Sequence, residues 1–321
     1  MKPRIFVTKP VPAKVEEFLS AYCDCVIWKE NAPLTREQLL ERVKDVEGLI
    51  VTSSSPRIDQ ELLDAAPRLK AVCSMSVGYD NIDVQALRQR GVVATHTPDV
   101  LNDTVADLVM TLMLSSARRA GELERYIREG KWQKKELDGR YFGVDVHHAT
   151  LGIIGMGRIG EAVARRAQFG FDMKVQYYNR RPRTLDKRLE AAYVSLDELL
   201  ETSDFIVVLT PLTPETRHLI GDKEFAKMKK QPILINVSRG PTVDEEALLR
   251  ALEQKQIRGA ALDVFYKEPI PGDHPLLQYE NVTALPHIGS ATHATRFKMA
   301  MLAAENMANL ISGKPPLTEI R

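Results

Sequence analysis

Short apolar runs alternate with helical patterns along the chain, and this alternation predicts parallel sheets. In the first hundred residues, patterns typical of strands cover 4–8, 25–28, 48–52, 70–74 and 92–95, and helical patterns cover 12–22, 35–44, 59–65 and 84–90. Strands separated by helices are typical of α/β domains, in which each helix returns the chain to the start of the next parallel strand. We therefore predict a small parallel-sheet α/β domain in this region.

A long apolar stretch leads from this region into a second α/β alternation. A helix is predicted over 105–117, continuing through 122–129 to Gly130, with apolar residues on more than one face. Such a helix suits burial between domains or subunits. Further strands are predicted at 150–154, 174–178, 205–209, 233–237, 259–264 and 282–284, and a last helix from Ser290 or Thr292 to Gly313. A chain of 321 residues is expected to hold two such domains.

The predicted strand at 150–154 runs directly into Gly155-x-Gly157-x-x-Gly160 and then a helix. Gly155 permits a tight turn, Gly157 lets the backbone approach a pyrophosphate, and Gly160 lets helix and strand pack closely. The free N–H groups at the start of the helix favour a bound anion. The motif predicts a dinucleotide-binding domain, with a glycine turn of purely structural use as the alternative.

The end of the next strand indicates which dinucleotide binds. Asn179 stands nineteen positions after Gly160, where NAD-binding folds usually place an acid for the ribose, and Arg180 and Arg181 follow it directly. Guanidinium groups present a planar fork of donors that suits a 2′-phosphate. NADP(H) is therefore preferred as the cofactor and NAD(H) remains possible. A solvated basic turn is the alternative interpretation.

Composition excludes several other classes of function. With 44 basic and 43 acidic residues the net charge is +1, which gives no support for binding nucleic acid or a membrane surface. No apolar run reaches the roughly 18 residues of a membrane span, and no signal-peptide pattern is present. Three cysteines do not form a disulfide framework, so reduced thiols in a cytoplasmic protein are expected. Without HExxH, CxxC or GxSxG motifs, neither a metal site nor a hydrolytic site is predicted.

Three residues near the ends of late strands have the types that hydride transfer to a 2-oxo acid requires. Arg239 offers a cation for a carboxylate, His287 an imidazole to deliver a proton, and Glu268 a carboxylate to hold the imidazole. Ligands of open α/β sheets bind at the carboxyl ends of strands, where these residues are predicted. Each alone has an ordinary interpretation as a turn or cap residue. His96, His218 and His274 are expected in loops or at strand ends.

The order of several motifs resembles that of the D-isomer-specific 2-hydroxyacid dehydrogenase family over nearly the whole chain. The motifs are VGYDNID at 77–83, DTVADL at 103–108, GIIGMGRIG at 152–160, LTPLTPET at 209–216, NVSRG at 236–240, LDVFYKEP at 262–269 and PHIGSAT at 286–292. Within that family, DVHHATLGIIGMGRIG and PHIGSATHATR are most similar to bacterial glyoxylate/hydroxypyruvate reductases that also reduce 2-ketogluconate. The resemblance implies a homodimer, a discontinuous flavodoxin-like substrate domain (1–101 and 290–321) and a Rossmann NADP-binding domain (102–289).

The resemblance also implies roles for individual residues. Arg239 would bind the substrate carboxylate and 2-oxo group, His287 would donate the proton, Glu268 would hold His287, and backbone amides of Val77 and Gly78 would bind the carboxylate. The positions that match cofactor contacts are Thr104, Gly155, Gly157, Arg158, Ile159, Gly160, Asn179, Arg180, Arg181, Thr210, Pro211, Thr216, Val237, Ser238, Arg239, Asp263, His287 and Gly289.

Together these features predict NADPH-dependent reduction of small 2-oxo acids such as glyoxylate, hydroxypyruvate and 2-ketogluconate to D-2-hydroxy acids. Domain closure with hinges near Asn102 and Ser290 would exclude water. Formate is disfavoured, because formate dehydrogenases of the family carry glutamine where Glu268 stands. Two alternatives remain: an NAD-dependent dehydrogenase of another substrate, such as phosphoglycerate, and a nucleotide-sensing binding protein of the same fold.

Overall fold

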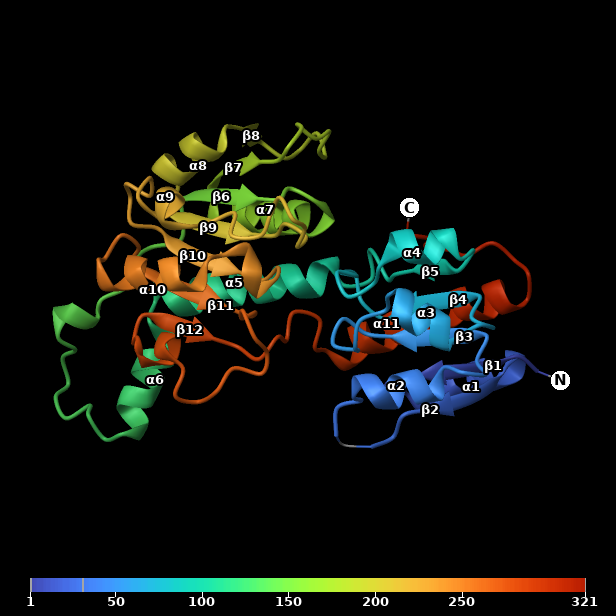
Figure 1. Ribbon diagram of the computed structural model, residues 1–321. Helices are drawn as coiled ribbons and strands as arrows, with labels where there is room; N and C mark the ends of the chain where they lie inside the picture. Colours follow the sequence, from blue (N-terminus) through green and yellow to red (C-terminus); the bar gives the residue numbers. More distant parts are fainter. Residues whose placement is uncertain (1, 31, 321) are drawn as a thin grey trace. The chain divides into compact units, whose positions relative to one another are not determined.

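The computed structural model describes residues 2–30 and 32–320, and the chain divides into two compact units. One unit is Met1–Leu101 with Ala291–Arg321, and the other is Asn102–Ser290. We call them the discontinuous unit and the central unit. Each contains one parallel sheet with helices on both faces (Figure 1), so the predicted class of two doubly wound α/β domains is confirmed.

The discontinuous unit has a five-stranded sheet in the order β2-β1-β3-β4-β5, the flavodoxin-like order. Its strands are β1 (Arg4–Val7), β2 (Asp24–Ile27), β3 (Gly48–Val51), β4 (Ala71–Ser74) and β5 (Val93–Thr95). Its helices are α1 (Ala13–Tyr22), α2 (Arg36–Arg42), α3 (Gln60–Ala65), α4 (Val84–Gln89) and α11 (His293–Ile311). One apolar cluster joins one sheet face to α1 and α11, and a second joins the other face to α2, α3 and α4.

The central unit has a seven-stranded sheet in the order β12-β11-β10-β9-β6-β7-β8. The strands are β6 (Thr150–Ile154), β7 (Lys174–Tyr178), β8 (Ala191–Tyr193), β9 (Phe205–Val208), β10 (Ile233–Asn236), β11 (Gly259–Leu262) and β12 (Val282–Ala284). The helices are α5 (Asn102–Ala117), α6 (Ala120–Arg128), α7 (Arg158–Phe171), α8 (Leu196–Thr202), α9 (Asp222–Phe225) and α10 (Glu245–Glu253), with short 3-10 turns at Gly139–Tyr141, Gly240–Thr242 and Pro275–Gln278. The chain order reverses between β9 and β6, which creates the switch point where open α/β sheets bind ligands.

The predicted continuous helix from 105 to 130 is wrong, because the chain breaks into α5 and α6. Arg119, between the two helices, has a left-handed backbone with φ of 53°. The carbonyl oxygen of Ala117 accepts a hydrogen bond from the N–H of Val144 (2.9 Å), and a Cβ on Gly143 would lie 2.1 Å from that oxygen. A segment distant in sequence therefore packs against the end of α5, where the helix stops. The last helix begins as predicted after Thr292, whose side chain caps it.

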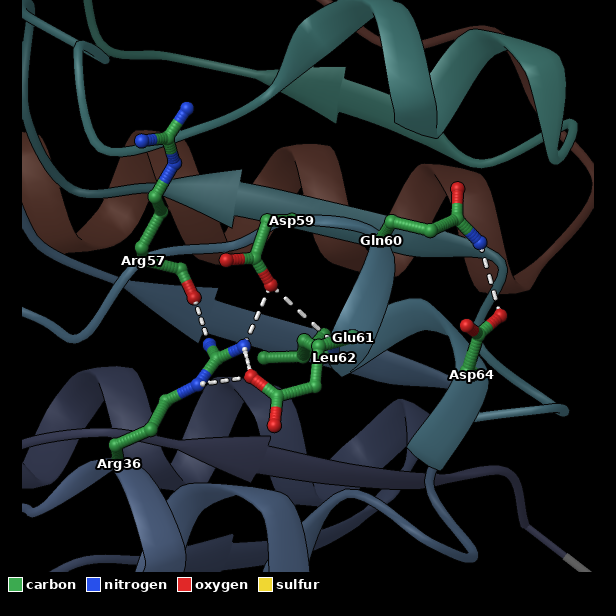
Figure 2. A network of polar contacts seen from close by, with 7 residues as sticks. All are labelled: Arg36, Arg57, Asp59, Gln60, Glu61, Leu62 and Asp64. Atoms are coloured by element: carbon green, nitrogen blue, oxygen red, sulfur yellow. Dashed lines mark hydrogen bonds and ion pairs between the residues drawn. The ribbon is translucent and has the colours of Figure 1, made fainter.

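A polar network fixes the loop that follows β3 in the discontinuous unit (Figure 2). The guanidinium of Arg36 donates to both Asp59 and Glu61 and to the carbonyl oxygen of Arg57. Asp59 also caps α3 by accepting from the N–H of Leu62 (3.3 Å). Burial opposes ionisation of Asp59, but the bonds from Arg36 and Leu62 outweigh it and lower its pKa. The first turns of α2 and α3 are thereby joined, and the end of the loop that leads into α3 is held in place.

Candidate active and nucleotide site

The candidate catalytic residues of the central unit follow strands that end at one edge of its sheet. Arg239 follows β10, Asp263 and Glu268 follow β11, and His287 follows β12. These three strands are neighbours and all run parallel, so their carboxyl ends lie at the same edge. The loops therefore leave neighbouring strands at one edge of the sheet, although Asp263 follows Arg239 by 24 residues and His287 follows Glu268 by 19.

His287 and Glu268 form a direct contact. Nδ1 of the imidazole lies 2.7 Å from Oε2 of the carboxylate, and the other oxygen, Oε1, accepts a hydrogen bond from the N–H of Phe265 (3.0 Å). Burial disfavours the charged carboxylate, but the bonds from His287 and Phe265 and the charges of His287 and Arg239 outweigh it, so the pKa of Glu268 is lowered. A carboxylate on Nδ1 leaves Nε2 as the nitrogen that can exchange a proton with a bound molecule.

The turn that carries Arg239 packs tightly against the loop that carries Glu268. A Cβ on Gly240 would lie 1.9 Å from the carbonyl oxygen of Phe265, so only glycine fits at this position. Asn236, almost completely buried, donates to the carbonyl oxygen of Arg239 (3.1 Å) and accepts from the hydroxyl of Ser238 (2.8 Å). The sequence did not single out Gly240 or Asn236, yet they set the backbone from which the Arg239 side chain leaves.

Asp263 holds the segment that follows His287. Its two carboxylate oxygens accept hydrogen bonds from the N–H groups of Ile288 (2.7 Å) and Gly289 (2.8 Å). The residue is 1% exposed, and burial raises the pKa of Asp263, since these bonds and the charge of His287 offset only part of the effect. Asp263 thus fixes the backbone on the C-terminal side of His287 while Glu268 fixes its ring.

The three glycines of the loop after β6 have the distinct environments expected of a dinucleotide motif. Gly155 has φ of 103°, and a Cβ there would lie 2.8 Å from the carbonyl carbon of Leu209. A Cβ on Gly160 would meet the carbonyl oxygen of Gly155 at 2.8 Å, so α7 packs closely on the loop. Around Gly157, the N-cap of α7, no atom lies within 4 Å of the Cβ position. Only this position leaves room for a ligand to approach the backbone at the helix N-terminus.

The side chain of Asn179 is bonded to the glycine loop. Its Oδ1 accepts from the N–H of Met156 (2.7 Å) and its Nδ2 donates to the carbonyl oxygen of the same residue (3.1 Å). The N–H of Gly155 donates to the carbonyl oxygen of Tyr178, the residue directly before Asn179 (3.0 Å). Asn179 therefore stabilises the loop between β6 and α7, a role that its spacing from Gly160 did not reveal.

The other predicted cofactor residues lie on the loops around this turn. Arg180 and Arg181 are exposed after β7, and the charge of Arg180 contributes to the lowered pKa of Glu215, which its hydrogen bond with Thr213 lowers most. The hydroxyl of Thr216 bonds the carbonyl oxygen of Pro211 (2.6 Å) and so fixes the loop after β9. The remaining positions of the central unit are placed on α5 (Thr104), at the start of α7 (Arg158, Ile159) and after β9 and β10 (Thr210, Val237).

The residues present fit a nicotinamide dinucleotide. The hydroxyl oxygen of Thr210 is buried without a hydrogen-bond partner, and the N–H of the same residue lies 2.9 Å from the Cβ position of Gly155. An unpartnered polar atom therefore lies beside the glycine loop and the open helix start. Val77 and Gly78 belong to the discontinuous unit, after β4.

No group of three or more metal-ligating side chains occurs among the described residues. Burial raises the pKa of the thiols of Cys23 to about 11 and of Cys25 and Cys73 to about 12, and all three are free. In the part of the chain that the structure describes, no helix is both long and apolar enough to cross a membrane.

Comparison with known proteins identifies the family. Residues 110–289 match the family described as D-isomer specific 2-hydroxyacid dehydrogenase, NAD binding domain. The chain is 49% identical over 314 residues to glyoxylate/hydroxypyruvate reductase B of Yersinia pestis (strain Pestoides F), covering 98% of this chain and 95% of that protein.

Solved structures agree with this similarity over the full length. The NADPH-dependent glyoxylate/hydroxypyruvate reductase of Sinorhizobium meliloti, in complex with NADP and malonate, aligns with a TM-score of 0.88 at 34% identity and covers 100% of this chain and 97% of that one. The TT0316 protein from Thermus thermophilus aligns with a TM-score of 0.91 at 41% identity, covering 99% and 100%. The chain belongs to the D-isomer specific 2-hydroxyacid dehydrogenase family and is an NAD(P)-dependent oxidoreductase.

Proposed function

We propose that this protein uses NADPH to reduce small 2-oxo acids, glyoxylate and hydroxypyruvate foremost, to D-2-hydroxy acids. The observation that carries the proposal is the contact of 2.7 Å between His287 and Glu268, on the loop that packs against the turn of Arg239. The Yersinia relative named for the same two substrates, at 49% identity, supports it, and so does the Sinorhizobium enzyme solved with NADP.

The residues would divide the reaction between them. The nicotinamide cofactor, when bound, supplies the hydride to C2 of the substrate. Because Glu268 occupies Nδ1 of His287, Nε2 is free to donate the proton to the oxygen at C2. The guanidinium of Arg239 binds the carboxylate and stabilises negative charge developing on that oxygen. The resemblance to the family assigns carboxylate binding to the N–H groups of Val77 and Gly78 as well.

The loops of the discontinuous unit support a substrate range that includes 2-ketogluconate. Serines occupy 53–55, after β3, and recur at Ser74, the last residue of β4, and at Ser76, which follows that strand. The hydroxyl of Ser76 accepts from the N–H of Ser53 (2.9 Å), and Ser55 contacts the hydroxyl of Thr8 (2.8 Å). Ser53, Ser54 and Ser55 are at least partly exposed, and small hydroxyl groups of this kind can hydrogen bond with a longer polyhydroxylated chain.

A second copy of the chain is the partner that we propose, bound through the arm formed by α6 and the segment after it. Helix α6 has no buried residue in the single chain. Ile127 and Trp132 are each 56% exposed and Phe142 is 69% exposed, although all three are large apolar side chains. An apolar surface of this kind is stable in water when another protein surface covers it. A homodimer would supply that surface.

The first test is oxidation of NADPH, followed at 340 nm, with glyoxylate, hydroxypyruvate, pyruvate and 2-ketogluconate. We expect turnover with glyoxylate and hydroxypyruvate, and a decrease in kcat of about 10²–10⁴-fold in His287→Ala. Arg239→Ala should lose the use of carboxylate substrates.

The pH dependence of the reaction tests Glu268. Its lowered pKa means that Glu268 keeps its charge in the pH range where imidazoles titrate. In Glu268→Gln the alkaline limb of the kcat/KM profile should therefore move to lower pH.

Two results would contradict the proposal. Cofactor binding without turnover of any 2-oxo acid would favour a nucleotide-sensing protein. Near-normal turnover in His287→Ala would remove the histidine from the mechanism.

Gly157→Ala tests the site of the pyrophosphate. No protein atom lies within 4 Å of the new methyl group and φ is −95°, so the variant should fold, with a Tm within about 4 °C of the wild type. The methyl group occupies the approach to the helix start, so the Kd for NADPH should rise at least about tenfold, or 1.4 kcal/mol. Gly170→Ala, at the other end of the same helix and equally open, is the matched control and should leave the Kd unchanged. Equal affinities in both variants would place the pyrophosphate elsewhere.

Arg180→Ala with Arg181→Ala tests the choice of cofactor. Removing two cations beside a 2′-phosphate should raise the Kd for NADPH by about 10- to 100-fold, while the Kd for NADH changes little. Fluorescence titration with both cofactors measures the ratio. Arg183→Ala, an exposed arginine of the same basic turn, serves as the control. An unchanged ratio in the double variant would mean that the turn is only solvated.

Ile127→Ser with Phe142→Ser tests the arm. We expect the sedimentation coefficient to change from that of a dimer to that of a monomer, because the substitutions remove the large apolar side chains from the proposed interface. Phe169→Ser, on the exposed face of α7, removes a phenylalanine that is 58% exposed and should leave the dimer intact. A dimer that persists in the arm variant would refute this interface.

A further inference from the structure

His96, at the end of β5, is bonded to the loop proposed to bind the substrate carboxylate. Its Nδ1 lies 2.9 Å from the carbonyl oxygen of Val77, which follows the neighbouring strand β4. A carbonyl oxygen can only accept, so Nδ1 carries the hydrogen in this contact. The ring also meets Tyr79 edge-on, at 5.4 Å between centroids. Sequence patterns assign His96 no role beyond that of a residue at a strand end.

The direction of one peptide unit follows from this bond. In a planar trans peptide the C=O of Val77 and the N–H of Gly78 point in opposite directions. Holding the carbonyl on His96 therefore turns the N–H of Gly78 away from the ring. Among the described residues of this unit, neither Val77 nor Gly78 donates its N–H to a protein acceptor. The loop thus has two N–H groups from which a carboxylate can accept hydrogen bonds.

The backbone of His96 is itself fixed by the C-terminal segment. The N–H of His96 donates to the carbonyl oxygen of Thr318 (3.2 Å), and the Thr318 hydroxyl donates to the carbonyl oxygen of His96 (2.6 Å). Thr318 is bonded in turn to both polar atoms of the Asn306 side chain. Asn306 belongs to α11 and is itself fully buried. The N–H of Thr97 donates to the carbonyl oxygen of Ser76 (3.0 Å), the residue directly before Val77. A continuous set of bonds therefore joins α11 to the loop.

We propose that His96 is a positioning residue for the substrate: its Nδ1–H holds the Val77 carbonyl so that the N–H of Gly78 faces the carboxylate of the 2-oxo acid. The inference rests on the proposed function, because it assigns the geometry of the same carboxylate site. His96 acts through a backbone peptide and has no part in proton transfer. Its loss should weaken substrate binding and leave cofactor binding unchanged.

Two nearly isosteric variants separate this role from a general structural one. In His96→Asn the Nδ2 group stands where the imidazole Nδ1 stood and can still donate to Val77, so KM for glyoxylate and hydroxypyruvate should stay within about threefold of wild type. In His96→Asp the same position carries an acceptor that repels the carbonyl, so KM should rise by about 10- to 100-fold. The Kd for NADPH should stay within about twofold in both, because the glycine loop belongs to the other unit.

Thr318→Val gives an independent measurement if the aspartate variant fails to fold. It removes the hydroxyl that bonds His96 and keeps the side-chain volume, so KM should rise in the same direction, by about threefold or more, with the Kd for NADPH unchanged. Equal KM values in the asparagine and aspartate variants, in an active enzyme, would overturn the role of His96 alone. A wild-type protein that reduces no 2-oxo acid would overturn the proposed function and this inference with it.

Discussion

The close contact between Gly240 and the carbonyl group of Phe265 is the constraint on which the chemistry of the central unit depends. With 1.9 Å between the Cβ position and the oxygen, no side chain fits, and the turn after β10 lies directly on the loop after β11. Phe265 then donates its N–H to Glu268, and Glu268 contacts His287. The positions of the cation, the carboxylate and the imidazole are therefore not independent. All three depend on the parallel strands β10, β11 and β12, which end at one edge of the sheet, and on the absence of a side chain at Gly240.

Local patterns predicted most of the fold, and they singled out side chains of the candidate site by their chemical type. The strand, glycine turn and helix at 150–171 form a contiguous signal, and the structure has β6, the turn and α7 there. What the sequence could not predict depends on distant partners. The break at Arg119 accompanies a hydrogen bond from Val144, 27 residues beyond Ala117. The amide of Asn179 bonds Met156, 23 residues away, and His96 bonds a backbone oxygen that no sequence pattern marks. Side-chain chemistry can be identified from sequence, whereas hydrogen bonds to backbone groups require the fold.

At three loops of the candidate site, a side chain holds a backbone group by a hydrogen bond. Asn179 holds Met156 in the glycine loop, Asn236 holds Arg239, and His96 holds Val77. In the two asparagines one amide supplies a donor and an acceptor, which a carboxylate of the same shape cannot do. Loops that connect parallel strands to helices have few backbone bonds of their own, so such side chains fix their conformation. Each of these loops therefore has part of its backbone held by a side-chain hydrogen bond.

Asp263 and Glu268 show how two acids five residues apart acquire opposite properties. Asp263 is 1% exposed, and burial raises its pKa although it accepts two backbone N–H groups. Glu268 is partly exposed, and the imidazole of His287, the Phe265 N–H and the charge of Arg239 outweigh burial and lower its pKa. The negative charge beside the imidazole therefore resides on Glu268, where solvent and the cation of Arg239 stabilise it. Asp263 orders the chain after His287, while Glu268 contacts Nδ1 of its ring.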